Sequence, residues 1–222
     1  MNRMTTVVAG LVLIGANVNA GAASISYYLD QTNIDSGALV DGVPYALVTI
    51  DDNVPNQLNF TVSLLASLTS IAGSNFGIDN FAFNVVGANP LQDSGTVAGQ
   101  WTLPAGWAGN VEPPAIQADG FGRFDARVDG GGSTRLTTLS FSLNNTALTL
   151  YSFAEASHNG NGQGNVYFAA HIAGFSPGAP ASSGYFGGST LTAVPLPASL
   201  PLLLTGIGLC LRNIRRRVSV QG

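Results

Sequence analysis

Between Ser24 and Ala193 the chain alternates apolar and polar residues in short runs, and no helical periodicity persists beyond about three turns. Alternation with a period of two is typical of strands that bury one face. Clusters of Gly, Pro, Asn and Asp separate the runs and supply the backbone conformations that turns require. The pattern predicts eight or nine strands, at 24–29, 45–50, 58–64, 81–85, 123–128, 138–143, 148–153, 166–172 and 190–194.

These strands predict an all-β fold, an antiparallel β-sandwich with jelly-roll-like connectivity. A parallel sheet is disfavoured because the sequence offers no crossover helices. We expect one sandwich domain over 24–175, with a helical turn at 65–71 and a long ordered loop at 101–114. The stretch 176–193 is rich in Gly, Pro, Ala and Ser, so we expect a linker there that can include the last strand.

Charge is scarce in this chain, and most of it is negative. Only 9% of the residues are charged, and there is no Lys. All 12 acidic residues lie between Ser24 and Ala193 beside three arginines, so the net charge of that region is 3 − 12 = −9. We therefore expect no binding to nucleic-acid phosphates. The single cysteine, Cys210, lies outside that region, which excludes disulfides and cysteine chemistry from the domain.

Residues 1–23 have the three parts of a secretory signal peptide. Arg3 gives the positive start, 7–15 form an apolar segment, and small residues at 18–23 suit a signal peptidase. The apolar segment is too short to remain as a membrane span. We expect export by the Sec pathway, with cleavage after Ala20, Ala22 or Ala23.

The last 29 residues, 194–222, also have three parts. The first is a stiff, extended pentapeptide, because each proline fixes its own φ and disfavours helix at the preceding residue; it comprises Val194, Pro195, Leu196, Pro197 and Ala198. An apolar run at 198–211 follows, which would span about 21 Å as a helix against a hydrocarbon core of about 30 Å. The third part is a basic cluster of Arg212, Arg215, Arg216 and Arg217. The positive-inside rule places this cluster in the cytoplasm, which agrees with a domain sent outward.

The pentapeptide, the apolar helix and the arginine cluster together resemble the PEP-CTERM sorting signal, and more closely its Val-Pro-Leu-Pro-Ala variant. Leu196 stands where the family pattern has Glu. The resemblance covers about an eighth of the chain. It implies a Gram-negative surface or matrix protein that is anchored transiently in the inner membrane and processed by an exosortase, a membrane transpeptidase. It also implies an association with exopolysaccharide and biofilm.

Catalytic residues are not evident in the sequence. His158 and His171 are the only histidines, and no Gly-x-Ser-x-Gly elbow accompanies them. We therefore expect no enzyme, and structural roles for both histidines. A hydrolase would need a fold that brings one of them beside a Ser and an Asp.

Two binding alternatives remain open. Acidic residues cluster at 51–53, at 79–80 and at 119–129, and oxygen ligands of this kind suit Ca²⁺, although turn-forming residues explain the same positions. Trp101, Trp107 and Phe121 could form an aromatic platform for sugar rings, or they could be buried. The main expectation is thus a non-enzymatic exported surface protein without a cofactor, and the alternative is a carbohydrate-binding module assisted by calcium.

Overall fold

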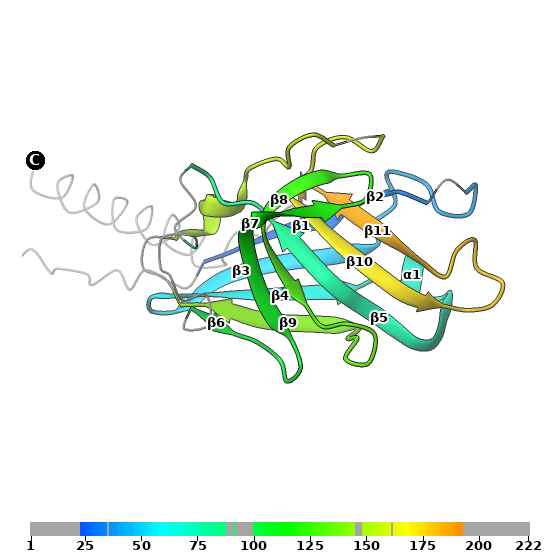
Figure 1. Ribbon diagram of the computed structural model, residues 1–222, viewed down its shortest axis with the longest axis horizontal. Helices are drawn as coiled ribbons and strands as arrows, with labels where there is room; N and C mark the ends of the chain where they lie inside the picture. The colour runs from blue at the N-terminus through cyan, green and yellow to red at the C-terminus, as the bar shows by residue number, and fades with distance from the viewer. Residues whose placement is uncertain are drawn as a thin grey trace, which may run out of the picture.

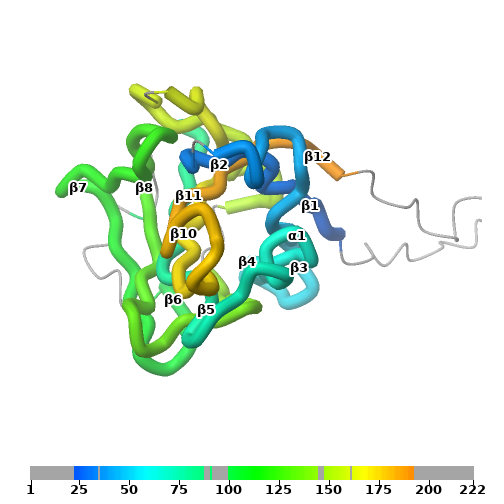
Figure 2. The backbone as a smooth tube through the Cα atoms, turned by 90° about the vertical axis from the view of Figure 1, so that its right-hand side faces the viewer, coloured from blue at the N-terminus to red at the C-terminus, as the bar shows by residue number. Residues whose placement is uncertain are grey.

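The computed structural model describes residues 23–34, 36–87, 91, 100–144, 148–160 and 162–192. These residues form two antiparallel sheets that pack face to face (Figure 1). Figure 2 separates the two layers, with β1 and β3 on one side and β7 and β8 on the other. The prediction of an all-β fold made of two antiparallel sheets is confirmed.

The first sheet, called sheet A here, has the strand order β12-β1-β3-β4-β9-β6. Its strands are β1 (Ser24–Leu29), β3 (Ala46–Val54), β4 (Gln57–Leu64), β6 (Trp101–Thr102), β9 (Thr138–Leu143) and β12 (Thr190–Leu191). A short helix, α1 (Ala66–Thr69), follows β4 and confirms the expected helical turn. The two edge strands, β12 and β6, have two residues each, so sheet A presents little open edge to other chains.

The second sheet, sheet B, has the order β2-β11-β10-β5-β8-β7. Its strands are β2 (Gln31–Thr32), β5 (Ala72–Phe83), β7 (Ala108–Ala118), β8 (Gly122–Asp129), β10 (Phe168–Phe175) and β11 (Ser183–Gly188). The edge strand β7 is long, but Pro113 and Pro114 lie in its register shift. Proline cannot donate to a ladder, so these two residues protect this edge from pairing with another chain.

The main core lies between the sheets and is dominated by aromatic rings. Phe60 of β4 is 1% exposed and lies at its centre. Its ring centroid is 4.7 Å from that of Phe141 in the neighbouring strand and 5.5 Å from that of Phe83 in the facing sheet. Phe153 meets the same ring edge-on at 4.9 Å. The alternation that places every second residue of β4 inward is therefore what joins the two layers.

A second, smaller cluster covers part of the outer face of sheet B. Ala82 and Ala169 lie there, because each is one residue out of phase with the phenylalanines that its strand buries in the main core. Phe121 is fully buried in this cluster. The other members are Ile116, Ala118, Phe124 and Val166. Sheet B is thus buried on both faces at this end.

The linker expected at 176–193 is wrong for residues 183–188, whereas the last strand expected within this stretch is present at 190–191. Residues 183–188 form β11, which pairs with β10 and β2 inside sheet B, and 190–191 form β12 in sheet A. The glycines that suggested flexibility are needed for close packing instead. A Cβ on Gly187 would lie 2.8 Å from the Phe121 ring, and one on Gly188 would collide with the Tyr28 carbonyl.

Two other segments also differ from expectation. The loop predicted at 101–114 contains β6 and the first half of β7. The strand predicted at 148–153 contains a 3₁₀ helix, η2 (Leu150–Phe153), which begins with a Thr149–Ser152 capping box. Leu150 and Phe153 are buried whereas Tyr151 is exposed, which is the spacing of three that a 3₁₀ turn requires.

We predict that Phe60→Ala lowers the free energy of unfolding by about 3–5 kcal/mol, because it leaves a cavity among rings from both sheets. Tyr151→Ala is the matched control: this side chain is 71% exposed, so the expected change is under about 0.5 kcal/mol. Chemical unfolding followed by the fluorescence of Trp101 and Trp107 measures both. Equal losses in the two variants would contradict this description of the core.

Candidate functional site

The predicted sorting residues lie outside the described part of the chain. This applies to the motif from Val194 to Ala198, to the basic cluster from Arg212 to Arg217, and to residues 1–22 of the signal. None of the helices in the described ranges has the length and hydropathy that crossing a bilayer requires. What the structure does give is the position of the last described residue, which lies two residues before the motif.

The described chain begins and ends on neighbouring strands of sheet A. β12 pairs antiparallel with β1, with Leu191 opposite Tyr27. The amide of Thr192, the last described residue, donates to the Ser26 carbonyl at 2.9 Å. At the start of β1, the Ala23 amide donates to the Asp52 carboxylate at 2.7 Å. β12 therefore runs toward the end of the sandwich where β1 begins.

The aromatic platform expected from Trp101, Trp107 and Phe121 is absent. Both indoles are only 8% exposed and belong to the main core, whereas Phe121 is fully buried in the second cluster on the outer face of sheet B. The Trp107 indole N–H donates to the Thr134 carbonyl at 3.0 Å. These rings serve packing, so they cannot stack on a sugar.

The three acidic clusters do not combine into a metal centre. Within the described ranges, no three His, Cys, Asp or Glu side chains come together in a way that could hold an ion. Asp51 accepts from the Asn59 amide at 2.9 Å, and Asp119 accepts from Asn33 at 3.2 Å. The Asp129 carboxylate is 2.8 Å from Arg127. The carboxylates of these clusters are thus engaged with amide and guanidinium groups of the protein.

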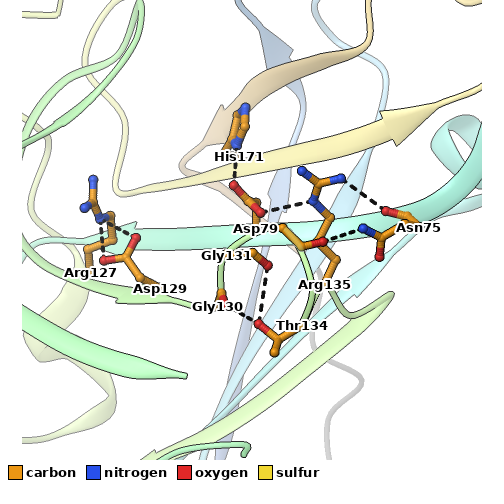
Figure 3. A network of polar contacts seen from close by, with 10 residues as sticks. Asn75, Asp79, Arg127, Asp129, Gly130, Gly131, Thr134, Arg135 and His171 are labelled. Atoms are coloured by element: carbon orange, nitrogen blue, oxygen red, sulfur yellow. Dashed lines mark hydrogen bonds and ion pairs between the residues drawn. The ribbon is translucent and has the colours of Figure 1, made fainter. Parts of the chain in front are cut away.

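The structure does bring His171 and Asp79 together, with Arg135 as a third member (Figure 3). His171 Nδ1 lies 3.2 Å from Asp79 Oδ2, and Arg135 Nε lies 3.0 Å from Asp79 Oδ1. All three side chains are about four-fifths buried. The Tyr185 ring covers the imidazole, with centroids 4.8 Å apart.

A β-bulge creates this contact. His171 pairs with Asn80 and the next residue, Ile172, pairs with Ile78, so Asp79 is the extra residue of β5. The bulge turns its carboxylate toward the loop after β8. Backbone groups strengthen the same junction, because the amides of Gly130 and Gly131 both donate to the Asp79 carbonyl. Asp79 therefore fixes the 130–137 loop to sheet B.

The network lacks the parts of a hydrolytic site. Among the described residues, no Ser or Thr hydroxyl hydrogen-bonds to His171 or to His158. His158 does not contact this network; its imidazole faces the Glu155 carboxylate at 3.8 Å and is 63% exposed. A triad needs a nucleophile beside the imidazole, so the chemistry supported here is structural pairing.

The two outer faces of the sandwich differ in charge. The three arginines of the described residues all lie on the sheet B side, and each is paired with an acid: Arg123 with Glu112 at 2.6 Å, Arg127 with Asp129, and Arg135 with Asp79. The outer face of sheet A carries no cation among the described residues. A ligand that binds the described part of this face must therefore be recognised without a positively charged side chain of the protein.

Burial raises the pKa of the Asp125 carboxyl. A hydrogen bond from the Val85 amide, 2.9 Å away, opposes this effect, and the nearby charge of Glu155 adds to it. A raised folded-state pKa means that the ionised form is disfavoured on folding. The destabilisation is complete above the folded-state pKa and vanishes below the unfolded value of about 3.8.

Comparison of the chain with family models, with curated proteins and with solved structures gave no match.

We predict that Asp79→Asn costs about 1–2 kcal/mol of unfolding free energy at pH 7, because it removes the charged acceptor of both Arg135 and His171. Glu112→Gln is the control, since its partner Arg123 is 41% exposed and exposed pairs contribute at most about 1 kcal/mol. Urea unfolding compares the two. A larger loss for Glu112→Gln would refute the anchoring role of Asp79.

A second prediction concerns pH. Asp125→Asn keeps an acceptor for the Val85 amide and removes the buried charge, so it should raise the unfolding midpoint at pH 7. The gain should shrink as the pH falls toward 3.8, where the wild-type carboxyl is neutral in both states. Thermal unfolding between pH 3 and pH 7 tests this, and a gain that grows on acidification would contradict it.

Proposed function

We propose that this chain is an exported bacterial surface or extracellular-matrix protein that an exosortase-type transpeptidase sorts and processes, and that it has no enzymatic activity of its own. In this proposal residues 1–23 direct Sec export. Residues 194–222 anchor the protein transiently in the inner membrane until the transpeptidase acts at Val194–Ala198. The expected helix in the signal, the transmembrane helix at the other end and the jelly-roll-like connectivity belong to this proposal.

The observation that carries the proposal is that the described fold reaches to within two residues of the motif. Thr192 is still hydrogen-bonded to β1, and Val194 is two residues further along the chain. Two extended residues reach about 7 Å at most. A motif at this position is tethered to the edge of a folded domain. All the strands of the described sandwich precede Val194 in the sequence, so processing at the motif would leave them intact.

The direction of the last strand supports the same role. β12 and β1 lie side by side, so the leader and the tail would leave the sandwich from neighbouring strands of sheet A. Anchoring by residues 198–211, with Arg212 to Arg217 in the cytoplasm, would then hold this edge of the domain toward the outer surface of the membrane.

The composition of the domain supports a location outside the cytoplasm. The domain has no cysteine, and its stability comes from an aromatic core rather than from disulfides. Its described part carries ten acidic residues and three arginines, a net charge of 3 − 10 = −7. Such a charge favours solubility among anionic polymers.

The alternative function, carbohydrate binding, loses the surface that suggested it, because Trp101 and Trp107 are buried. It would need another face of the sandwich. A hydrolase is not proposed, since neither histidine meets a hydroxyl among the described residues.

Mass spectrometry of the mature C-terminus, in host strains with and without the exosortase, tests the proposal. We expect a new C-terminus near Val194–Ala198 only when the enzyme is present. Replacing both prolines of the motif, Pro195→Ala with Pro197→Ala, should reduce processing because the peptide loses its extended stiffness. Pro201→Ala, in the apolar run, is the control. An intact Gly222 in both strains would refute the proposal.

A further inference from the structure

Two neighbouring rows on the outer face of sheet A consist mostly of small hydroxyl and amide side chains. Strand register aligns Ser26, Thr49, Thr61 and Ser140 in one row across four strands. A second row contains Asp51, Asn59, Ser142 and Thr102. The rows are side by side because alternate residues of a strand face the same way. The face therefore displays hydrogen-bonding groups in a regular pattern.

A shallow groove of about 340 Å³ crosses this array near β6. Its floor includes Thr61, Ser140 and Ser142, and Leu103 and Pro104 line it as well. Among the described residues the hydroxyls of Thr61 and Ser140 have no hydrogen-bond partner and are accessible to a ligand, whereas Ser142 is only 7% exposed. Each hydroxyl can donate one hydrogen bond and accept others. The groove thus combines an apolar wall with a floor of free donors and acceptors.

This combination matches the chemistry of a sugar ring, which has C–H groups on its faces and hydroxyls around its rim. The apolar wall suits the C–H groups, and the free hydroxyls suit the rim. The charges on this face narrow the class of ligand further. Asp51 is the one ionised group in the two rows, and it accepts from Asn59. With no cation on this face among the described residues and a net charge of −7 over them, an anionic polymer would be repelled.

We propose that the outer face of sheet A binds a neutral, extended polysaccharide, with one sugar ring in the groove between Leu103–Pro104 and the hydroxyls of Thr61 and Ser140. The array continues across β4, β3 and β1, so further sugars along the chain would meet Thr49 and Ser26. This deepens the surface role proposed above and rests on it only for the domain's exposure outside the cell. Binding itself requires no sorting.

Affinity electrophoresis of the full chain, in a polyoxyethylene detergent that contains no sugar, tests the proposal. Hydroxyethylcellulose, dextran and soluble starch are the neutral probes, and carboxymethylcellulose is the anionic counterpart of the first. We expect at least one neutral polymer to retard the protein and carboxymethylcellulose to leave it unretarded. Retardation by none of the neutral polymers, or equal retardation by carboxymethylcellulose, would overturn the proposal.

The variant Thr61→Val with Ser140→Ala removes two hydroxyls while keeping strand-compatible side chains. Two lost hydrogen bonds should weaken binding to the retarding polymer about tenfold or more, and the thermal midpoint should stay unchanged because neither hydroxyl has a partner in the described fold. Ser183→Ala, on sheet B, is the matched control and should bind like the wild type. Unchanged binding by the double variant would place the polysaccharide elsewhere and refute this site. Sorting in the host is measured separately, so either proposal can fail without the other.

Discussion

Contact between Phe60 and the rings of the facing sheet is the interaction on which the rest of the structure depends. Phe60 stacks on Phe141 within sheet A and on Phe83 of sheet B, and Phe153 closes the cluster edge-on. No disulfide is available to a domain without cysteine. Burial of these rings fixes which residues of each strand point inward, and so leaves the hydroxyl rows of sheet A and the ion pairs of sheet B on the outside.

Sequence patterns predicted the strands that bury one face, because period-two alternation follows directly from strand geometry. They missed β11, since its glycines have the composition of a linker. Only the packed structure shows that Gly187 lies against the Phe121 ring. The patterns also predicted a strand where η2 lies, because Leu148 and Leu150 alternate with the polar Thr149. In the structure, burial follows the spacing of three between Leu150 and Phe153. Local pattern is ambiguous wherever tertiary contact decides which residues are buried.

Contacts between distant segments could not be predicted. Asp79 and His171 are 92 positions apart and meet only because a bulge adds one residue to β5. The hydroxyl array was partly visible as alternating Ser, Thr and Asn residues in three predicted strands, but their alignment in rows depends on register. The prediction of an aromatic platform was wrong because large rings bury the most apolar surface, which a core without disulfides needs.

The central claim is that the fold extends to Thr192, so that the tail begins directly at the edge of sheet A. Cross-linking tests it: Tyr28→Cys and Thr190→Cys face each other across β1 and β12, in a Cys210→Ser background. With no Lys and no Arg between Arg135 and Arg212, trypsin yields one fragment ending at Arg123 and another beginning at Leu136. The account predicts that oxidation joins these two fragments in the folded protein and that reduction separates them. Fragments that stay separate after oxidation would show that 190–192 is a free linker and would contradict it.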